Sequence, residues 1–169
     1  MRNRGVGYDL LIRGPWGIGK TTIARSLATK IAQVISIDQI LEENDLWRTG
    51  RLSEFLEANS RAVDPARRRL KRGTPIIFDG NFYWKSQVED LVRRLAFRHI
   101  VFTLKAPLWV CIERDSRRDR PQGVQGCREV YAKSTRFEYG IGVDATRPIG
   151  SIVGEITSHL TTTSSTTPR

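Results

Sequence analysis

Residues 14–21 place glycine, lysine and threonine at the spacing G-x-x-x-x-G-K-T, in the stretch "GPWGIGKT". Glycines allow a tight turn whose backbone N–H groups point inward at an anion, and a following helix places its positive end at the same point. Lys20 is then expected at the β- and γ-phosphates of a nucleotide, and the Thr21 hydroxyl on Mg²⁺. A chance glycine-rich turn is the alternative, but the full motif lies between a predicted strand and a predicted helix. The sequence therefore predicts a phosphate-binding loop.

Two aspartates close predicted strands and are candidates for the reaction itself. Asp38 ends the second strand in "VISIDQIL", and Asp79 ends the third in "PIIFDGN". The carboxyl ends of parallel strands meet at one edge of a sheet, so Asp38 is expected beside the phosphate loop. There a carboxylate can accept the proton of a hydroxyl that attacks the γ-phosphate. The alternative is that Asp38 caps the next helix, and the two roles can coexist.

Other nucleotide-dependent classes leave signatures that this chain lacks. A motor-type ATPase is expected to end a strand in an acidic pair with a glutamate that activates water, whereas the third strand ends in "DGNF". No N-K-x-D motif for reading guanine occurs. A phosphate-binding loop alone does not identify the reaction, so these absences favour transfer to an acceptor over hydrolysis or GTP-dependent switching.

Apolar runs of strand length alternate with helical patterns. Strands are predicted at 8–13, 34–37, 75–78, 98–104 and 140–143. Helices are predicted at 20–32, 52–72, 86–97, 107–118 and 149–160. Pro65 is expected to break or restart the second helix. Apolar strands that each precede a helix indicate an α/β fold with a parallel sheet covered on both faces. We expect one domain over residues 1–160 and a disordered tail over 161–169.

Charge and composition limit the classes of partner. The 169-residue chain is 39% apolar and 27% charged, and its formal net charge is +10, with 22 arginines among 28 basic residues. Such a surface attracts nucleic acid, ATP and phosphorylated small molecules alike. No run is apolar enough for a membrane helix, no signal-peptide features occur, and the two cysteines have neither metal nor disulfide spacing. We expect a cytoplasmic protein without a membrane partner.

Five segments resemble the small P-loop kinases, a superfamily with chloramphenicol phosphotransferase, adenylylsulfate, gluconate and shikimate kinases, and the kinase domain of polynucleotide kinases. They are "GPWGIGKTT", "VISIDQIL", "PIIFDGNFYWKSQVEDL", "FTLKAPLWVCIERDSRRDR" and "EYGIGVDATRP", and they span roughly residues 8–160. The resemblance implies a three-layer α/β/α P-loop fold with five parallel strands, an arginine-rich lid at about 114–136, and ATP and Mg²⁺ as cofactors.

The resemblance also implies roles for individual residues. Asp38 matches the acceptor-side aspartate, and Asp79 matches an acidic residue near Mg²⁺ or the acceptor. Arg114 would lie against adenine, while Arg117, Arg118 and Arg120 would reach the transferring phosphoryl group. The alternative for any of these arginines is an exposed ion pair with a neighbouring acid. The nucleotide-binding residues implied are Gly14, Pro15, Trp16, Gly17, Ile18, Gly19, Lys20, Thr21, Thr22, Arg114, Arg147 and Pro148.

The acceptor is less defined by the motifs. The segment "DGNFYW" lacks the arginine of the D-G-[FY]-P-R motif expected of nucleoside monophosphate kinases, and Asp38 lacks the D-x-x-R arginine of 5′-hydroxyl polynucleotide kinases. Arg48 and Arg51 are candidates to bind an anionic acceptor or are surface residues. The aromatic side chains nearby either stack on the acceptor or pack in the core. The candidate acceptor lining is Trp47, Arg48, Arg51, Asn81, Phe82, Tyr83 and Trp84.

We therefore expect transfer of the γ-phosphate of ATP, with Mg²⁺, to an alcohol group of a small molecule. One alternative is a 5′-hydroxyl kinase acting on RNA or DNA, which the basic composition keeps open. Another is an ATP-binding regulatory module without an acceptor, in which Asp38 would have no catalytic purpose.

Overall fold

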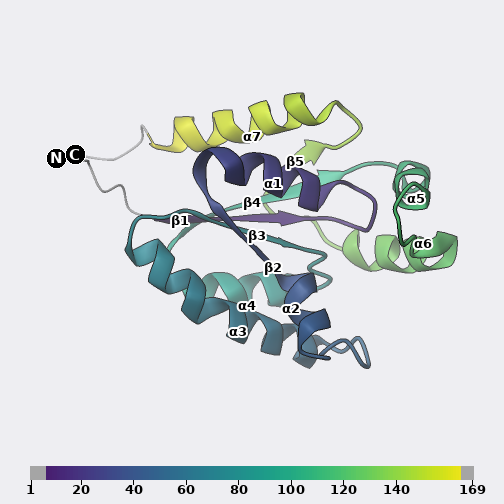
Figure 1. The fold of residues 1–169 in the computed structure, drawn as a ribbon, viewed down its shortest axis with the longest axis horizontal. Coiled ribbons are helices and arrows are strands. Elements are labelled where there is room, and N and C mark those ends of the chain that lie inside the picture. Colours follow the sequence, from purple (N-terminus) through teal and green to yellow (C-terminus); the bar gives the residue numbers. More distant parts are fainter. Residues whose placement is uncertain (1–6, 165–169) are drawn as a thin grey trace.

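The computed structural model describes residues 7–164, and within them five parallel strands form one sheet (Figure 1). The strands are β1 (Tyr8–Arg13), β2 (Gln33–Ser36), β3 (Ile76–Gly80), β4 (Arg98–Lys105) and β5 (Ile141–Asp144). Their order is β2-β3-β1-β4-β5, and every neighbouring pair is parallel. The predicted α/β fold is confirmed. Because β1 is central, the loop after it opens at the middle of the carboxyl edge.

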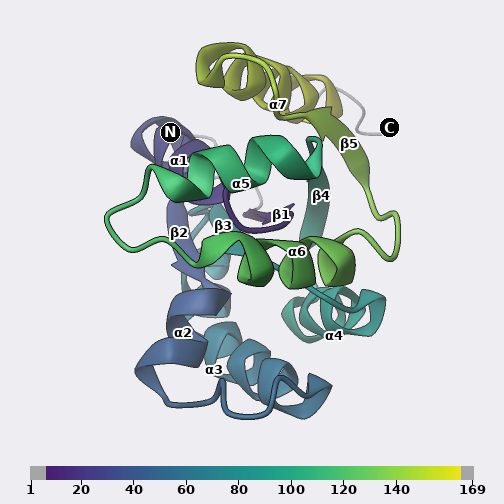
Figure 2. The same cartoon turned by 90° about the vertical axis from the view of Figure 1, so that its right-hand side faces the viewer.

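Helices cover both faces of the sheet and one of its ends. They are α1 (Lys20–Ile31), α2 (Ile37–Glu43), α3 (Leu52–Lys71), α4 (Lys85–Leu95), α5 (Leu108–Ser116), α6 (Gly123–Ser134) and α7 (Ile149–Ser164). Helices α1 and α7 lie on one face, and α2, α3 and α4 lie on the other (Figure 1). Helices α5 and α6 lie across the carboxyl end of the central strands (Figure 2).

The core is divided by the alternation of side chains along the strands. In β1, Leu10 and Ile12 belong to the apolar cluster that includes residues of α1 and α7. Leu11 belongs to the opposite cluster, which α3 and α4 complete. Successive residues of a strand point to opposite faces, so a sheet covered on both sides requires consecutive apolar residues, as at Leu10, Leu11 and Ile12.

Helix α3 continues through Pro65, so the predicted break at this residue is wrong. Proline inside a helix removes one hydrogen bond and costs about 3 kcal/mol. Ala58, Ala62 and Ala66 recur at four-residue spacing before and after the proline, and all three are buried in the core cluster that α3 shares with α4. This stripe requires one uninterrupted helix, and its burial offsets the local cost.

Further differences from the predictions concern α2, α6 and α7. The second strand ends at Ser36, and Ile37, expected in that strand, begins α2 because the Ser36 hydroxyl accepts a hydrogen bond from the Gln39 amide and caps the helix. Helix α6 forms inside the expected lid, where no helix was predicted. Helix α7 continues to Ser164 and takes in the first four residues of the expected disordered tail. Residues 165–169 of that tail lie outside the described residues.

Candidate active site

The loop between β1 and α1 has the backbone geometry that its glycines predict. Gly17 and Gly19 adopt φ values of 75° and 104°, in the left-handed region that favours glycine. A Cβ atom on Gly17 would also lie 2.1 Å from the Cys111 carbonyl oxygen of α5. Only glycine therefore fits at position 17, and the close approach fixes the loop against α5.

Lys20 begins α1 and is only 6% exposed. Its Nζ donates to the Pro15 carbonyl oxygen and to Asn81 Oδ1, both at 3.0 Å, so the ammonium lies across the loop. Burial lowers the pKa of Lys20, while the nearby carboxylates of Asp38 and Asp79 favour the charged form. The predicted acceptor contact Asn81 is itself fully buried and, in this structure, positions the lysine.

Asp38 lies in the first turn of α2, two residues after the strand ends, so its predicted place at the end of a strand is wrong, as is the alternative that it caps the helix. It still reaches the loop region, because its Oδ1 accepts a hydrogen bond of 3.3 Å from the Asn81 amide of the β3–α4 connection. Burial raises the pKa of Asp38 to about 6, opposed by the charge of Lys20. A carboxylate with that pKa is ionised at neutral pH and is a stronger base than an exposed aspartate.

Asp79 occupies the next-to-last position of β3 and is 2% exposed. Its Oδ2 has no hydrogen-bond partner among residues 7–164. Buried carboxylate oxygens are nearly always paired, so one left unpaired beside a phosphate loop is suited to a cation or its bound water. The same part of the chain holds no cluster of three or more acidic, histidine or cysteine side chains that would bind a metal by themselves.

A cavity of about 1260 Å³ brings these groups together at the carboxyl edge of the sheet. Small-molecule sites usually measure about 300–1,000 Å³, so this space suits two ligands side by side. Predicted site residues in its wall are Trp16, Gly17, Ile18, Gly19, Lys20, Thr21, Thr22, Asp38, Trp47, Asp79, Arg114, Arg118 and Arg147. Predicted site residues outside its wall are Gly14, Pro15, Arg48, Arg51, Asn81, Phe82, Tyr83, Trp84, Arg117, Arg120 and Pro148.

The lid separates its arginines into two groups. Arg114 donates to the Ile18 carbonyl oxygen at 3.2 Å, and Arg118 pairs with Asp115 at 3.3 Å; both line the cavity. Arg117 lies outside it and pairs with Glu113 at 2.5 Å, as the ion-pair alternative predicts. Arg120 is exposed and also lies outside. The roles in catalysis stay predictions, but only Arg114 and Arg118 lie where a phosphate could be reached.

A buried carboxylate holds the turn that carries Arg118. Asp115 is buried in α5, and its Oδ2 accepts hydrogen bonds from the backbone amides of Gln122 and Gly123 at 2.8 and 3.1 Å. These two amides open α6, so Asp115 satisfies N–H groups that a helix start leaves unpaired. Asp115 therefore holds the turn between α5 and α6, and Arg118 lies on that turn.

A family model described as "AAA domain" (AAA_33) matches residues 10–136, from β1 past the end of α6. The chain belongs to this family. The probable adenylyl-sulfate kinase of Pyrococcus abyssi (strain GE5 / Orsay) is 28% identical over 137 residues, which cover 78% of this chain and 72% of that protein. The predicted membership of the small P-loop kinases is confirmed, and with it the prediction that the chain is an enzyme of this class.

Two solved structures share the fold. A sugar kinase from Janibacter sp. HTCC2649 superimposes with a TM-score of 0.76 at 17% identity, covering 91% of this chain and 94% of that one. The APS kinase of Mycobacterium tuberculosis, solved with AMPPNP and APS, gives 0.70 at 16% identity, covering 91% and 97%. At such identities the likeness establishes the P-loop kinase architecture alone.

On the acceptor side of this P-loop kinase, most predicted aromatic residues serve packing. Phe82 and Tyr83 are buried in the core, and Trp84 packs against it. Trp47 lines the cavity, with its ring centroid 6.0 Å from that of Trp16. Arg48 binds Asp45 instead of facing the cavity. Arg51 precedes α3, where its backbone amide donates to Glu54.

On the opposite side, sequence reasoning missed apolar wall residues. Ala145, Ile149 and Ile152, at and after the end of β5, line the cavity beside Arg147. Arg147 forms an ion pair with Glu155 and donates to the Asp144 carbonyl oxygen at 3.2 Å. The resemblance to the small P-loop kinases implies that the loop containing Ala145 contacts adenine, whereas no sequence signal marked Ile149 and Ile152, because aliphatic residues are common in any core. Among the described residues, no helix is long and apolar enough to cross a membrane.

Arg13 is a further residue that sequence reasoning missed. It ends β1, is fully buried, and donates to the carbonyl oxygens of Ser134, Phe82 and Phe137 and to Thr103 Oγ1. Burial lowers the pKa of Arg13 to about 10, so it remains a cation at neutral pH. Ser134 is the last residue of α6, whose negative dipole end suits a cation. Arg13 thus ties the lid to the strand that carries the phosphate loop.

Proposed function

We propose that this kinase transfers the γ-phosphoryl group of ATP, with Mg²⁺, to an alcohol group of a small molecule. The observation that carries the proposal is the position of Asp38. Its carboxylate shares one cavity with the phosphate-loop residues Lys20 and Thr21, and burial raises its pKa to about 6. A base in that position can orient the acceptor hydroxyl and remove its proton as the oxygen attacks. A module that only binds ATP would not need such a base.

The donor side supports ATP binding by the chain's own groups. The loop amides and the start of α1 face the phosphates, and Lys20 neutralises charge on the β- and γ-oxygens. Thr21 and Asp79 would hold Mg²⁺, because Asp79 Oδ2 is buried without a partner among the described residues and both side chains line the cavity. When bound, Mg²⁺ supplies further neutralisation of the phosphate charge. Magnesium prefers few protein ligands, which fits one carboxylate and one hydroxyl.

The lid is suited to stabilise charge as the phosphoryl group moves. Arg118 and Arg114 line the cavity from α5 and the turn after it. Phosphoryl transfer requires positioning and charge neutralisation more than covalent chemistry, and planar guanidinium groups bind phosphate oxygens in pairs. Adenine would then lie toward Ala145, Ile149 and Arg147, where the wall is partly apolar.

Free, buried Cys111 and Cys127 agree with the expected cytoplasmic location.

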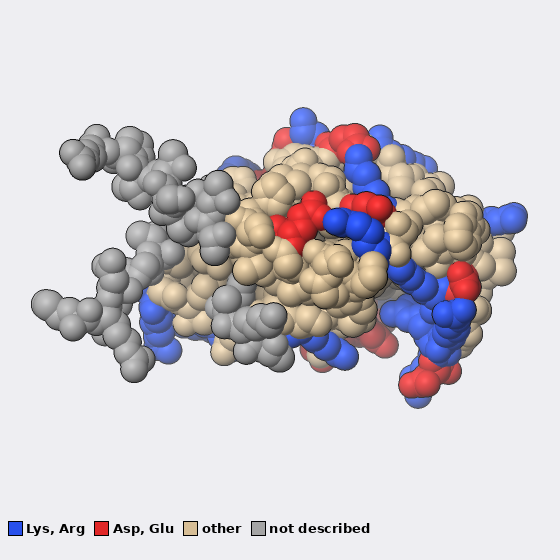
Figure 3. Space-filling model, turned by 90° about the horizontal axis from the view of Figure 1, so that it is seen from above, with Lys and Arg blue, Asp and Glu red and all other residues tan. Residues whose placement is uncertain are grey.

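A 5′-hydroxyl nucleic-acid kinase is the second candidate, favoured by the net charge of +10. Figure 3 shows Lys and Arg side chains gathered toward the end of the molecule where α5 and α6 lie. The acceptor wall argues against it, because Asp38, Glu42 and Asp45 line that part of the cavity and would repel a phosphodiester backbone.

The test is transfer of label from [γ-³²P]ATP with Mg²⁺ to a panel of hydroxyl compounds, comprising nucleosides, sugars, amino acids and 5′-hydroxyl oligonucleotides. We expect label on one class of small molecule. Label only on oligonucleotides, with a steep loss of binding as salt rises, would replace the proposal by the nucleic-acid kinase. Tight ATP binding without label on any compound would favour the ATP-binding module.

A further inference from the structure

The wall of the cavity on the acceptor side is acidic. Asp38, Glu42 and Asp45 recur at four- and three-residue spacing along α2 and the residues just after it, and all three line the cavity. The four-residue spacing places Asp38 and Glu42 on one side of the helix, and Asp45 follows in the turn after it. Glu43 is a fourth carboxylate in the wall and accepts a hydrogen bond of 2.5 Å from Gln39. The reacting hydroxyl must approach Asp38, so its molecule lies along this row.

The cations that line the cavity belong to other elements, and two of them, Lys20 and Arg118, act on Asp38. Lys20, Arg114, Arg118 and Arg147 line it from the phosphate loop, the lid and the β5–α7 connection. Arg48 pairs with Asp45 at 3.6 Å, but their side chains are 67% and 88% exposed, and such pairs contribute little. An acceptor that carries a carboxylate or sulfate would therefore meet like charges along α2 without an arginine to hold it.

Two tryptophans form the apolar part of the same region. The Trp16 and Trp47 rings lie 6.0 Å apart at 42° to each other, and both residues line the cavity. Trp47 is held by edge contacts with Phe55 and Tyr83, yet remains 37% exposed. Indole faces stack on rings and attract cations through the negative charge of the π face.

The acidic row belongs to a ligand cavity and is more than a solvated face of a helix. Asp79 lines the same cavity, is 2% exposed, and its Oδ2 lacks a partner among the described residues. An unpartnered carboxylate oxygen buried at this depth is costly unless a ligand completes its contacts. Asp38, Glu42 and Asp45 line the same cavity as Asp79, and Glu42 and Asp45 are its more exposed residues.

From these contacts we propose that the acceptor is a hydroxylated ring compound that carries a protonated amine, as an amino sugar does, and that Glu42 selects it. The ring lies against Trp16 and Trp47, the amine faces Glu42, and the hydroxyl faces Asp38. This inference rests on the proposed function, and it excludes acceptors whose recognition depends on a carboxylate or sulfate group.

Three methyl glycosides that share one ring test the inference, namely those of glucosamine, glucose and glucuronic acid. We measure kcat/KM for phosphoryl transfer to each at saturating ATP and Mg²⁺ in low salt. We expect the amine to exceed the neutral sugar about tenfold and the carboxylate by more, because opposite charges attract and like charges repel at the wall. The Glu42→Lys variant should invert the order. The matched control is Glu57→Lys, since Glu57 is an exposed α3 residue paired with Arg61 outside the cavity, and it should keep the wild-type order.

Equilibrium binding of the same glycosides to the AMPPNP-bound protein, measured by calorimetry, separates this inference from the proposed function. Preference for the amine in binding, lost in Glu42→Lys, together with an absence of label on every acceptor would overturn the transfer reaction and retain the ligand class. Efficient transfer to the glucuronide, or an amine preference that Glu42→Lys leaves unchanged, would overturn the ligand class and retain the kinase. Equal binding of the three glycosides would also overturn the proposed ligand class.

Discussion

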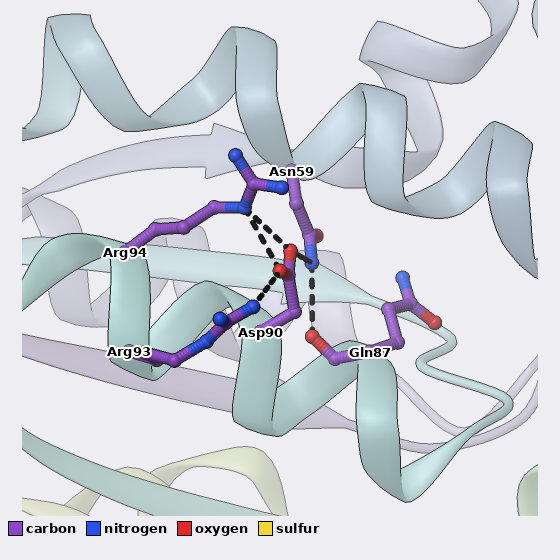
Figure 4. A network of polar contacts seen from close by, with 5 residues as sticks. All are labelled: Asn59, Gln87, Asp90, Arg93 and Arg94. Carbon is purple, nitrogen blue, oxygen red and sulfur yellow. Dashed lines mark hydrogen bonds and ion pairs between the residues drawn. The ribbon is translucent and has the colours of Figure 1, made fainter.

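The carboxylates in two regions of this kinase have opposite surroundings. Between α3 and α4, Asp90 accepts hydrogen bonds from Asn59, Arg93 and Arg94 (Figure 4). Burial alone would raise the pKa of Asp90, but these bonds hold it below its usual value. At the cavity, Asp79 Oδ2 has no partner in the described part of the chain. There burial raises the pKa of Asp38 to about 6.

The difference distinguishes the carboxylate that stabilises the fold from those that remain available to a ligand. A carboxylate that the protein pairs completely stabilises the ionised form and contributes to folding. One left incompletely paired at the edge of a cavity lowers stability and remains available to a ligand or a proton. Asp90 therefore belongs to the packing of α3 on α4, whereas Asp38 and Asp79 remain the carboxylates that we propose for the reaction.

The largest combined effect on ATP binding and transfer is expected from removing Lys20, the cation that interacts with both site carboxylates. Lys20→Ala should reduce kcat/KM for transfer about 10³-fold and weaken ATP binding, because the β- and γ-phosphates lose their charged partner. Initial rates and calorimetric ATP titrations measure both quantities. Wild-type values of both would show that the glycine loop does not bind phosphate.

Two neighbouring arginines sharpen the distinction between site and surface. Arg118→Ala should lower kcat about 10²-fold, since Arg118 lines the cavity. Arg117→Ala, which removes an exposed ion pair with Glu113, should change kcat less than about threefold. Equal losses in the two variants, measured at saturating substrates, would contradict the division of the lid.

Asp90 should show the reverse pattern. Asp90→Ala should lower the free energy of unfolding by about 2 kcal/mol, because it removes charged hydrogen bonds and leaves Asn59 with a buried amide short of one acceptor. Urea unfolding measures the loss, and kcat should remain at the wild-type value. A variant of full stability would show that the network contributes nothing to the packing of α3 on α4.

Asp9 is a buried carboxylate away from the cavity, so it tests whether burial without a position in the site affects catalysis. We expect its substitution to have the smallest effect, a change in stability alone. Asp9 is fully buried at the start of β1, away from the carboxyl edge, and both carboxylate oxygens lack partners among the described residues. Burial raises the pKa of Asp9 to about 7, so its stabilising protonated form is lost as pH rises from about 4 to 7. Relative to Asp9→Asn, the wild type should lose about 1–2 kcal/mol between pH 5 and 7, without a change in kcat. Parallel pH profiles of stability would contradict this.

The phosphate loop and the sheet were predictable from sequence because their signals are local. Gly14, Gly19 and Lys20 follow a motif in which each residue type has one physical purpose. The strands are short apolar runs that each precede a helix, which indicates a parallel sheet, whereas their order is known only from the structure. The predictions were wrong where tertiary packing overrides local propensity. At Pro65, burial of the alanine stripe of α3 keeps the helix continuous.

The walls of the cavity were harder to predict because exposure depends on how the lid and α2 pack. Arg117 and Arg118 are adjacent and alike in sequence, yet only the second faces the cavity. Arg48 was a candidate for an anionic acceptor, but the turn after α2 directs it to Asp45. The four-residue spacing of the acidic residues on α2 is meaningful only once the helix is known. The predicted strand at 34–37 included Ile37, the first residue of this helix.

The most direct test of the account compares Asp38→Asn with Asp90→Asn in one set of measurements, namely ATP affinity, transfer rate against pH and free energy of unfolding. For Asp38→Asn we expect ATP affinity within about threefold of wild type and transfer reduced about 10²–10⁴-fold. Stability at pH 7–8 should be equal or higher, since the raised pKa of Asp38 makes its ionised form destabilising above about pH 6. Wild-type transfer should rise with pH through about 6, and Asp90→Asn should lose stability while keeping that profile. Unchanged turnover in Asp38→Asn would contradict the account.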